Sequence, residues 1–519
     1  MNGEQEHHVN PWVVSLAVML GTFMVVLDTT VVNVSLPHIA GSLSSTIDET
    51  TWALTSYLAA NAIVLPITGW LSNHFGRKRL LIMSLAGFTT SSFLCGLSLS
   101  LPMLILFRIA QGATGGALQP ISQAVLLEAF PPAERGKAMG FWGLGIVVAP
   151  ILGPVLGGWL TDNYTWRWVF YINVPVGVLA VIMARMFVFD PPYIGRSSET
   201  VDYWGLGLLA LGVLSLQIAL DQGRSLDWFQ SSVITGLLLT SVAAWVVFIW
   251  RELVIEHPIV DLRVFKIGTY TIGVVATVVL GFVLYGSLIL LPIMLQTLLG
   301  YPALQAGIAM APRGFGSFLA MPVVGYLTSK IDARKLVAAG LVSGAWTLFW
   351  LGGLNLQAGY WDIFWPQFFQ GIALGLLFVP LTTITMAPIP RERMGNAASL
   401  FNLMRNIGGS VGIAMTATLL ANRQEMHRQV LSEHVNPYSP ASQQMFSALK
   451  SALMARGADA FTATQQAYVA MNGMVMKQAA MLSFLDVFHA LGIIFLIMAP
   501  AMFIMRRPEM STEHVMVSE

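Results

Sequence analysis

The chain has 519 residues, of which 55% are hydrophobic and only 10% are charged, and its mean hydropathy is +0.69. Soluble domains carry about 25% charged residues, so the composition excludes a soluble protein and indicates an integral membrane protein. A formal net charge of +1 gives no reason to expect a nucleic-acid partner. The single cysteine, Cys95, excludes an intrachain disulfide and a multi-cysteine metal site.

Apolar windows of about 20 residues, the length of a helix that crosses a bilayer, follow one another along the chain. They begin near residues 12, 51, 80, 101, 138, 168, 204, 232, 269, 304, 336, 363, 396 and 484. The windows are continuous rather than alternating, which argues against a membrane β-barrel. The sequence therefore predicts an all-α integral membrane protein with fourteen transmembrane helices in a lipid bilayer.

The basic residues orient these spans. Connections on the side of the N-terminus hold most of the Lys and Arg residues, whereas the short connections on the other side hold only Arg167 and Arg224. Cytoplasmic loops carry the excess of basic residues, so we expect both termini to be cytoplasmic. The long segment 422–482 then lies on the outer side.

The two ends of the chain repeat one another. Pro66, Gly69, Leu71, Lys78, Arg79 and Leu80 match Pro322, Gly325, Leu327, Arg334, Lys335 and Leu336 at an offset of 256, Gln111-Gly112 matches Gln370-Gly371 at 259, and Glu134-Arg135 matches Glu392-Arg393 at 258. We therefore expect two six-helix halves, 1–190 and 269–519, joined by a linker, 191–268, that carries two inserted helices. Secondary transporters alternate access by rocking two such halves about a site at the midplane.

The first span contains a carboxylate at membrane depth. Asp28 follows Met24-Val25-Val26-Leu27, and an ionisable residue in such a segment is by default a functional hypothesis. Arg108 in the fourth span is the only other charge of this half at similar depth. At 1.5 Å per residue, both residues lie roughly 11–12 Å below the expected outer surface. We expect Asp28 to carry a coupling proton that Arg108 tunes; the alternative is a static ion pair.

Other polar residues at membrane depth are candidates for a substrate cavity. They are Asn33, Tyr57, Asn61, Gln111, Gln119, Gln123, Tyr285, Arg313, Gln367, Gln370, Asn402 and Arg405. In the fourth span they lie on one helical face, where each glutamine is equally suited to bonding a neighbouring helix. Arg313 and Arg405 have no deep carboxylate in their half, so a helix-end carbonyl or an anionic substrate group is their expected partner.

Several of these motifs resemble those of the major facilitator superfamily. The loop signature is Gly69, Asn73, Gly76, Arg77 and Lys78, and the antiporter motif of the fifth span is Gly145, Pro150, Gly153, Pro154, Gly157 and Gly158. Leu27–Pro37 and Trp166–Pro175 resemble motifs of the fourteen-helix drug:proton antiporters, the EmrB/QacA group. The resemblance covers about residues 12–505. It implies export of lipophilic toxic compounds across the bacterial inner membrane, driven by the proton gradient without a cofactor or metal.

Two of these motifs allow more specific expectations. Small residues at every fourth position of the fifth span permit close helix packing, and its prolines produce a kink, so we expect this helix to close one side of a cavity at the junction of the halves. Many members of the superfamily carry an acidic residue at the position of Asn73, and the repeat has Ser329. We therefore expect a neutral hydrogen bond from Asn73, beside Arg77 and Lys78, in place of a charged latch.

The segment 422–482 contains two helical patterns. Ser439-Pro440 predicts a helix start, and the stretch from Thr464 to Met481 predicts a helix that runs into the last span. A segment of this length is often functional. The resemblance implies that it meets a periplasmic membrane-fusion adaptor, which passes substrate to an outer-membrane channel; a cap over the helix ends is the alternative.

Three other functions compete with multidrug export. The first is export of a single endogenous lipophilic metabolite or fatty acid. The second is a membrane-embedded enzyme such as an acyltransferase, for which His489 near Asp486 is the only deep histidine and has no evident nucleophile partner. The third is a passive channel, which the antiporter-type fifth span argues against.

Overall fold

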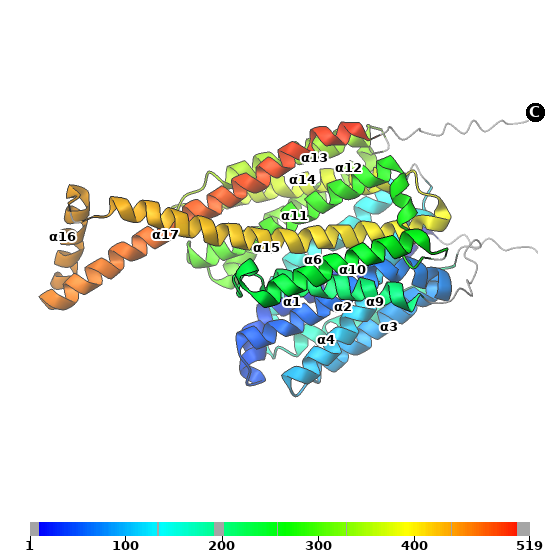
Figure 1. Cartoon of the computed structure of the whole chain (residues 1–519), viewed down its shortest axis with the longest axis horizontal. Helices are drawn as coiled ribbons and strands as arrows, with labels where there is room; N and C mark the ends of the chain where they lie inside the picture. The colour runs from blue at the N-terminus through cyan, green and yellow to red at the C-terminus, as the bar shows by residue number, and fades with distance from the viewer. Residues whose placement is uncertain are drawn as a thin grey trace, which may run out of the picture.

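The computed structural model describes residues 10–131, 134–190, 202–256, 258–328, 330–436 and 438–505. Every regular element within these residues is helical, which confirms the all-α fold. The helices lie side by side in one bundle, and α15, α16 and α17 project from one end of it (Figure 1).

The first half of the bundle contains six spans. Its helices are α1 (Pro11–Ser42), α2 (Ile47–Phe75), α3 (Arg77–Gly96), α4 (Leu101–Gly115), α5 (Leu118–Ala129), α6 (Arg135–Asn163), α7 (Trp168–Tyr171) and α8 (Asn173–Phe187). The short helices combine into longer ones, because α4 and α5 form one span, Leu101–Ala129, and α7 and α8 form another, Trp168–Phe187.

The rest of the chain contributes the inserted pair and the second half. The helices are α9 (Tyr203–Gln222), α10 (Ser232–Val254), α11 (Gly268–Thr297), α12 (Ala303–Leu327), α13 (Ala333–Leu351), α14 (Tyr360–Met386), α15 (Met394–His434), α16 (Pro440–Ala455) and α17 (Ala460–Met498), with 3-10 turns η2 (Trp228–Gln230), η3 (Leu262–Lys266), η4 (Arg391–Arg393) and η5 (Pro500–Ile504). The predicted boundaries of the halves and the linker stay predictions.

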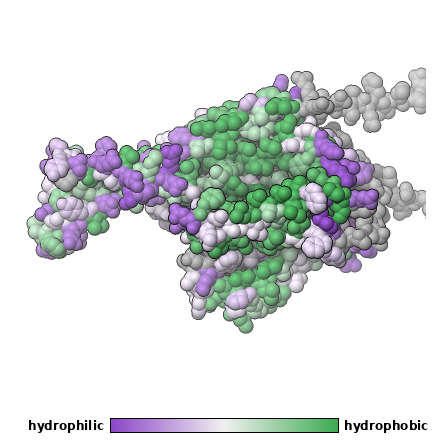
Figure 2. Space-filling view, in the orientation of Figure 1, coloured by the Kyte–Doolittle hydropathy of each residue, from purple (hydrophilic) through white to green (hydrophobic). Residues whose placement is uncertain are grey.

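The bundle has the surface of a membrane protein. Among the described residues, eleven helices are long and apolar enough to cross a bilayer, and α6 is a twelfth when its two segments, bent by 42°, are taken together. The less apolar α13 and α15 pack in the same bundle, against α14 and α11. Hydrophobic residues cover the visible flank, while hydrophilic ones gather at the projection and at the opposite end (Figure 2). This arrangement is consistent with fourteen membrane helices.

The first helix is longer than the sequence suggested. α1 passes the expected exit at Leu36 and continues to Ser42, with Pro37 inside it, because neighbouring helices in a membrane protein make a proline tolerable. Asp28 is therefore about 21 Å from the end of α1 at 1.5 Å per residue. The end of α1 is thus six residues beyond the expected one, while the depth of Asp28 below the membrane surface stays a prediction.

The internal repeat is visible in the packing. Gly112 of α4 lies against the backbone carbonyl of Tyr57 in α2, and Gly371 of α14 lies against that of Arg313 in α12. A Cβ atom at either glycine would collide with that carbonyl. The same two contacts at the repeat offsets make Arg313 the counterpart of Tyr57, and place Gln367 at the position that corresponds to Arg108.

The two halves touch closely at one end of the bundle, here named the terminal end, where α1 begins and α2 stops. A Cβ atom on Gly69 of α2 would lie 2.7 Å from the Cα of Asn396 in α15. Likewise, a Cβ atom on Gly140 of α6 would lie 2.7 Å from the carbonyl oxygen of Met321 in α12. Only glycine at these positions allows the backbones to approach this closely.

The antiporter motif in α6 lies elsewhere. Gly145, Gly153 and Gly157 pack against Met19, Thr30 and Val31 of α1, within the first half. The expected kink is present as the 42° bend, and α6 lies at the junction of the halves, where it packs against α12. The close contacts there are made by Gly136 and Gly140, nearer the start of α6, rather than by the motif glycines. Pro150 is half-buried, Gly158 faces no neighbour within 4 Å, and the side chain of Pro154 lies outside the described structure.

The projection is mainly helical rather than a loop. α15 has 41 residues and α17 has 39, while about 20 residues cross a bilayer, so both helices continue beyond the bundle. α16 begins at Pro440 after the N-cap Ser439, and the stretch from Thr464 to Met481 lies within α17. Both predicted helical patterns in 422–482 are confirmed.

Candidate functional site

Asp28 is the centre of a buried polar network inside the first half. Its side chain is 1% exposed. Arg108 Nη1 donates to Asp28 Oδ2 at 2.5 Å, while Gln111 Nε2 and Asn173 Nδ2 donate to Asp28 Oδ1 at 3.0 and 2.8 Å. The two charges that the sequence placed at equal depth are therefore in contact. Their network ties α1 to α4 and α8.

Arg108 is enclosed on all sides. Its Nε donates to the carbonyl of Ala53 at 3.1 Å, and its guanidinium lies 4.1 Å from the centre of the Tyr57 ring. The Phe170 ring centre is 5.7 Å away. Since all three partners of Asp28 are donors, this arrangement stabilises the ionised carboxylate, and the low dielectric of the site strengthens the attraction to Arg108.

The network also contains polar atoms without a partner. Arg108 Nη2, Tyr57 Oη and Asn173 Oδ1 are buried and form no hydrogen bond with a described residue. Leaving a buried donor or acceptor unpaired costs about 1–3 kcal/mol each.

A second polar cluster joins the two halves near mid-depth. Arg405 Nη2 of α15 donates to Gln119 Oε1 of α5 at 2.9 Å, and Asn402 Nδ2 donates to Gln123 Oε1 at 2.6 Å. Arg405 Nη2 also donates to Asn402 Oδ1 at 2.7 Å. Arg405 is eleven residues after the start of α15, which places it roughly 16 Å along the helix, about halfway across a bilayer core of about 30 Å.

The second half has buried positive charge without a counter-charge. Arg405 is 3% exposed, and its Nε and Nη1 atoms form no hydrogen bond with a described residue. Arg313 is 6% exposed and makes no hydrogen bond or ion pair with the part of the chain that the structure describes. An uncompensated buried charge costs several kcal/mol, so a group that supplies negative charge here would be strongly stabilised.

Some of the other predicted cavity residues belong to these clusters and the rest lie elsewhere. Gln111 belongs to the Asp28 network, and Tyr57 packs on Arg108 instead of lining an open cavity. Gln367 and Gln370 bond each other on α14 at 3.1 Å. Tyr285 packs against Gly409 of α15. Asn61 is half-buried, and Asn33 is exposed on α1 and belongs to neither cluster.

The loop signature lies at the terminal end and involves two acids that sequence reasoning missed. Arg77 forms a buried ion pair with Glu128 at the end of α5, and Asp190 Oδ1 accepts a hydrogen bond from the backbone N–H of Lys78 at 2.8 Å. Gly76 between the helices has φ +86°, a conformation that favours glycine. Asn73 is exposed and bonds no described residue, so the expectation of a neutral hydrogen bond from it was wrong. Ser329 lies outside the described residues.

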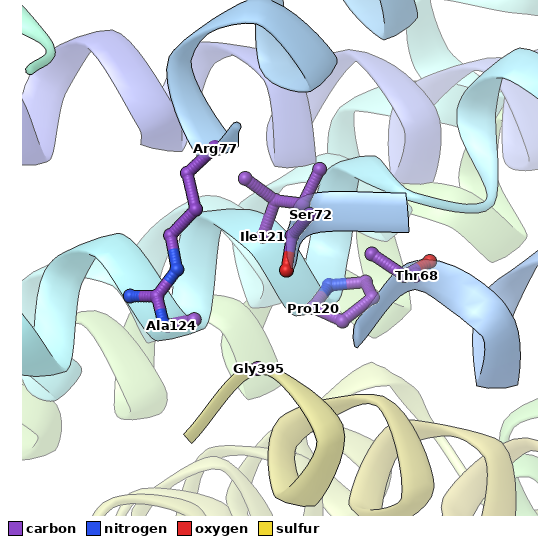
Figure 3. A pocket seen from close by; sticks show the side chains of 7 residues that line it. All are labelled: Thr68, Ser72, Arg77, Pro120, Ile121, Ala124 and Gly395. Carbon is purple, nitrogen blue, oxygen red and sulfur yellow. The ribbon is translucent and has the colours of Figure 1, made fainter. Parts of the chain in front are cut away.

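Arg77 reaches a small pocket where the halves meet. Figure 3 shows its guanidinium beside Ala124, with Thr68 and Ser72 from α2 nearby and Gly395 at the start of α15 opposite. The pocket is too narrow to hold a substrate.

The sequence carried signals for some of the missed residues. Asn173 lies in the motif Trp166–Pro175, and its Nδ2 also donates to Ser92 Oγ at 3.0 Å. Glu128 is an acid at the end of an otherwise apolar span. Asn396, whose side chain bonds the backbone of Asp261 at 2.9 Å, had no signal of its own.

The structure offers little support for an enzyme. Asp486 pairs with His427 at 2.8 Å, while the ring of His489 packs 5.8 Å from that of Phe349 and against Gly352. The described residues contain no group of three His, Cys, Asp or Glu side chains that would hold a metal.

Comparison with known proteins fits this geometry. The sequence profile of the Major Facilitator Superfamily matches residues 18–413. The chain belongs to this superfamily. Within it, the chain is 42% identical over 447 residues to the "Multidrug export protein EmrB" of Escherichia coli (strain K12), covering 84% of this chain and 86% of that protein. It is 37% identical over 500 residues to the "Fatty acid resistance protein FarB" of Neisseria gonorrhoeae, covering 95% and 96%.

Solved structures of the superfamily share the fold. The human organic anion transporter MFSD10 superposes with a TM-score of 0.60 at 12% identity, over 94% of this chain and 99% of that one. The chain is therefore an EmrB-like member of the Major Facilitator Superfamily, a membrane transporter and a multi-pass protein of the inner membrane. The predicted roles of its site residues stay predictions.

Proposed function

We propose that this protein is a proton-coupled exporter of lipophilic toxic compounds that works by alternating access. One observation carries the proposal: Asp28, a carboxylate buried at membrane depth, is held by three donors on two other helices. Intramembrane carboxylates that face the interior of a bundle serve proton relays in pumps and transporters.

The network links a proton to helix movement. Protonation of Asp28 removes its charge, so the attraction to Arg108 is lost and the hydrogen bonds from Gln111 and Asn173 are no longer charge-assisted. The contacts that tie α1 to α4 and α8 then weaken together. The proton is thereby coupled to the relative position of α1, which also packs along α6 through Gly153 and Gly157.

Alternating access requires the terminal end to open. In the present arrangement the halves are in contact there through Gly69 and Asn396, and through Gly140 and Met321. We infer that the terminal end is the cytoplasmic one and that the structure corresponds to a state closed to the cytoplasm. Release of the proton from Asp28 toward the cytoplasm and capture of substrate follow when this end opens.

The names of the relatives support export of harmful compounds. They are a multidrug export protein, a fatty acid resistance protein, and a colistin resistance protein of Acinetobacter baumannii that is 30% identical over 430 residues. A second candidate function is export of a fatty acid or one endogenous lipophilic metabolite. The match to the fatty acid resistance protein over 95% of this chain favours it.

The helical projection suits delivery to a partner. α15, α16 and α17 continue beyond the bundle, and α16 packs on α17 with the rings of Phe446 and Tyr468 at 4.6 Å. Exposed apolar side chains remain on it, including Phe461, Tyr468 and Val469. We propose that the projection is periplasmic and binds a membrane-fusion adaptor, which passes substrate to an outer-membrane channel.

The proposal is tested in proteoliposomes that contain the purified protein. Uptake of a lipophilic fluorescent compound is measured under an imposed pH gradient, for wild type, Asp28→Asn and the control Asp227→Asn. Asp227 is exposed and has φ +55°, which Asn tolerates. We expect Asp28→Asn to lose gradient-driven accumulation and the control to retain it. Full uphill transport by Asp28→Asn would remove Asp28 as the coupling site.

A further inference from the structure

The guanidinium of Arg405 is a cation that the protein itself does not neutralise. It is buried between the halves, and its hydrogen-bond acceptors are the side-chain amide oxygens of Gln119 and Asn402. Two of its nitrogens, Nε and Nη1, have no partner among the described residues. A carboxylate would satisfy one of them together with Nη2, because the bidentate pairs of a guanidinium are Nε with Nη2 and Nη1 with Nη2, as when Arg251 binds Asp202 through Nε and Nη2.

Burial alone does not explain why Arg405 lacks a counter-charge, as a comparison with Arg108 shows. Arg108 is equally buried, but Asp28 lies 2.5 Å from it. The chain can therefore form an ion pair at membrane depth. In the second half, however, the position that corresponds to Arg108 in the internal repeat is Gln367, which carries no charge. Arg313 adds a second buried cation to the same half.

The surroundings of Arg405 are apolar on one side. The ring of Phe378 lies 5.6 Å from the guanidinium, and the Trp142 ring, from the other half, lies 5.9 Å from that of Phe378. Phe378 thus adjoins the guanidinium, and Trp142 lies beside Phe378. An aromatic surface next to a charged donor is the combination that holds an apolar body and fixes one polar group.

We propose that Arg405 binds the carboxylate of an amphiphilic anionic substrate at the junction of the two halves. This inference rests on the proposed export function and names its substrate class. The carboxylate replaces Gln119 as the acceptor for Arg405, since a charge-assisted hydrogen bond is stronger than one to a neutral amide. Loss of the Arg405–Gln119 bond releases one of the two links between α5 and α15, so substrate binding favours movement of the halves.

The experiment measures binding without a gradient, on the purified full-length protein in nanodiscs. The probes are two matched pairs, naphthalene-2-carboxylate with its carboxamide and dodecanoate with its amide. The variants are Arg405→Gln, Arg405→Lys and the exposed-loop control Arg224→Gln. Thermal melting of each variant checks that it is folded.

We expect wild type and Arg224→Gln to bind each carboxylate more tightly than its amide. Arg405→Gln is expected to weaken carboxylate binding by at least about tenfold, equivalent to about 1.4 kcal/mol, and to change amide binding by less than about threefold. Arg405→Lys retains the charge but not the planar fork, so its carboxylate affinity is expected to fall between those of the wild type and Arg405→Gln. A structural role alone would weaken both members of a pair equally.

Equal binding of carboxylate and amide by the wild type would overturn the inference, as would unchanged carboxylate affinity in Arg405→Gln. Its failure is distinguishable from failure of the export proposal. If the pH gradient drives accumulation of a lipophilic cation while no carboxylate binds, the export function stands and the anion site is wrong. If carboxylates bind through Arg405 but no gradient drives transport, the site stands and proton coupling is wrong.

Discussion

The two halves differ in whether their buried arginines have a counter-charge. In the first half, Arg108 is paired with Asp28 and enclosed by hydrogen-bond acceptors and aromatic rings. In the second half, the repeat position of Arg108 carries Gln367, that of Tyr57 carries Arg313, and Arg405 approaches the junction with amide partners only. In the proposed mechanism, the first half holds and releases the proton, whereas the second half takes negative charge from the substrate. This proposal assigns a proton site to one half of the repeated fold and a substrate site to the other.

The largest expected effect breaks the compensated pair. Arg108→Gln leaves Asp28 buried without its counter-charge, so we expect a loss of about 3–5 kcal/mol in stability. The double variant Asp28→Asn/Arg108→Gln removes both charges and is expected to regain most of this loss. Thermal melting in detergent measures both. Equal melting temperatures of wild type and Arg108→Gln would show that the pair is not held as described.

The matched change in the second half is expected to behave differently. Arg405→Gln removes a charge that has no counter-charge, so stability is expected to stay within about 1 kcal/mol of wild type or to rise. The same melting assay compares it with Arg108→Gln. A large loss of stability in Arg405→Gln would mean that the guanidinium is a structural link between the halves, and the contrast between the halves would disappear.

How much of this contrast could be predicted from the sequence depends on the kind of contact. Counting along the helices placed Asp28 and Arg108 at the same level. The two residues are in contact, although α1 ends beyond the residue expected. The repeat offsets predicted the equivalent packing of Gly112 and Gly371. These inferences need only position along a helix, which periodicity and topology supply.

Contacts that depend on helix rotation were not predictable in this way. Asn173 reaches Asp28 from α8, and Gln119 reaches Arg405 across the halves, only when three helices adopt a definite mutual orientation. The neighbour of the α6 glycines was not predictable for the same reason, since small residues indicate close packing without naming the neighbour. The expectation for Asn73 was wrong because Asp190, 117 positions later in the chain, provides the acid at that loop.

A smaller effect is expected at the edge of the proton site. Asn173→Ala removes one hydrogen bond to Asp28 and leaves the ion pair, so it is expected to cost about 1–3 kcal/mol and to shift the pH dependence of transport without abolishing it. Transport rates across a pH series test this. Unchanged profiles would show that Asn173 does not influence the proton site.

The smallest effect is expected at the loop signature. Asn73→Ala changes an exposed side chain and is expected to alter stability by less than about 0.5 kcal/mol, whereas Asp190→Asn weakens the bond to the backbone N–H of Lys78 and is expected to reduce transport severalfold. Transport assays on both variants compare them. A greater loss with Asn73→Ala than with Asp190→Asn would contradict the placement of the acid at Asp190.

The separation of proton and substrate sites is tested most directly by measuring exchange and accumulation on the same proteoliposomes. Asp28→Asn is predicted to exchange labelled for unlabelled substrate across the membrane near the wild-type rate, yet to lose accumulation driven by a pH gradient. If Asp28→Asn loses both activities in parallel while thermal melting shows that it is folded, Asp28 belongs to the substrate site, and the division of roles between the halves is wrong.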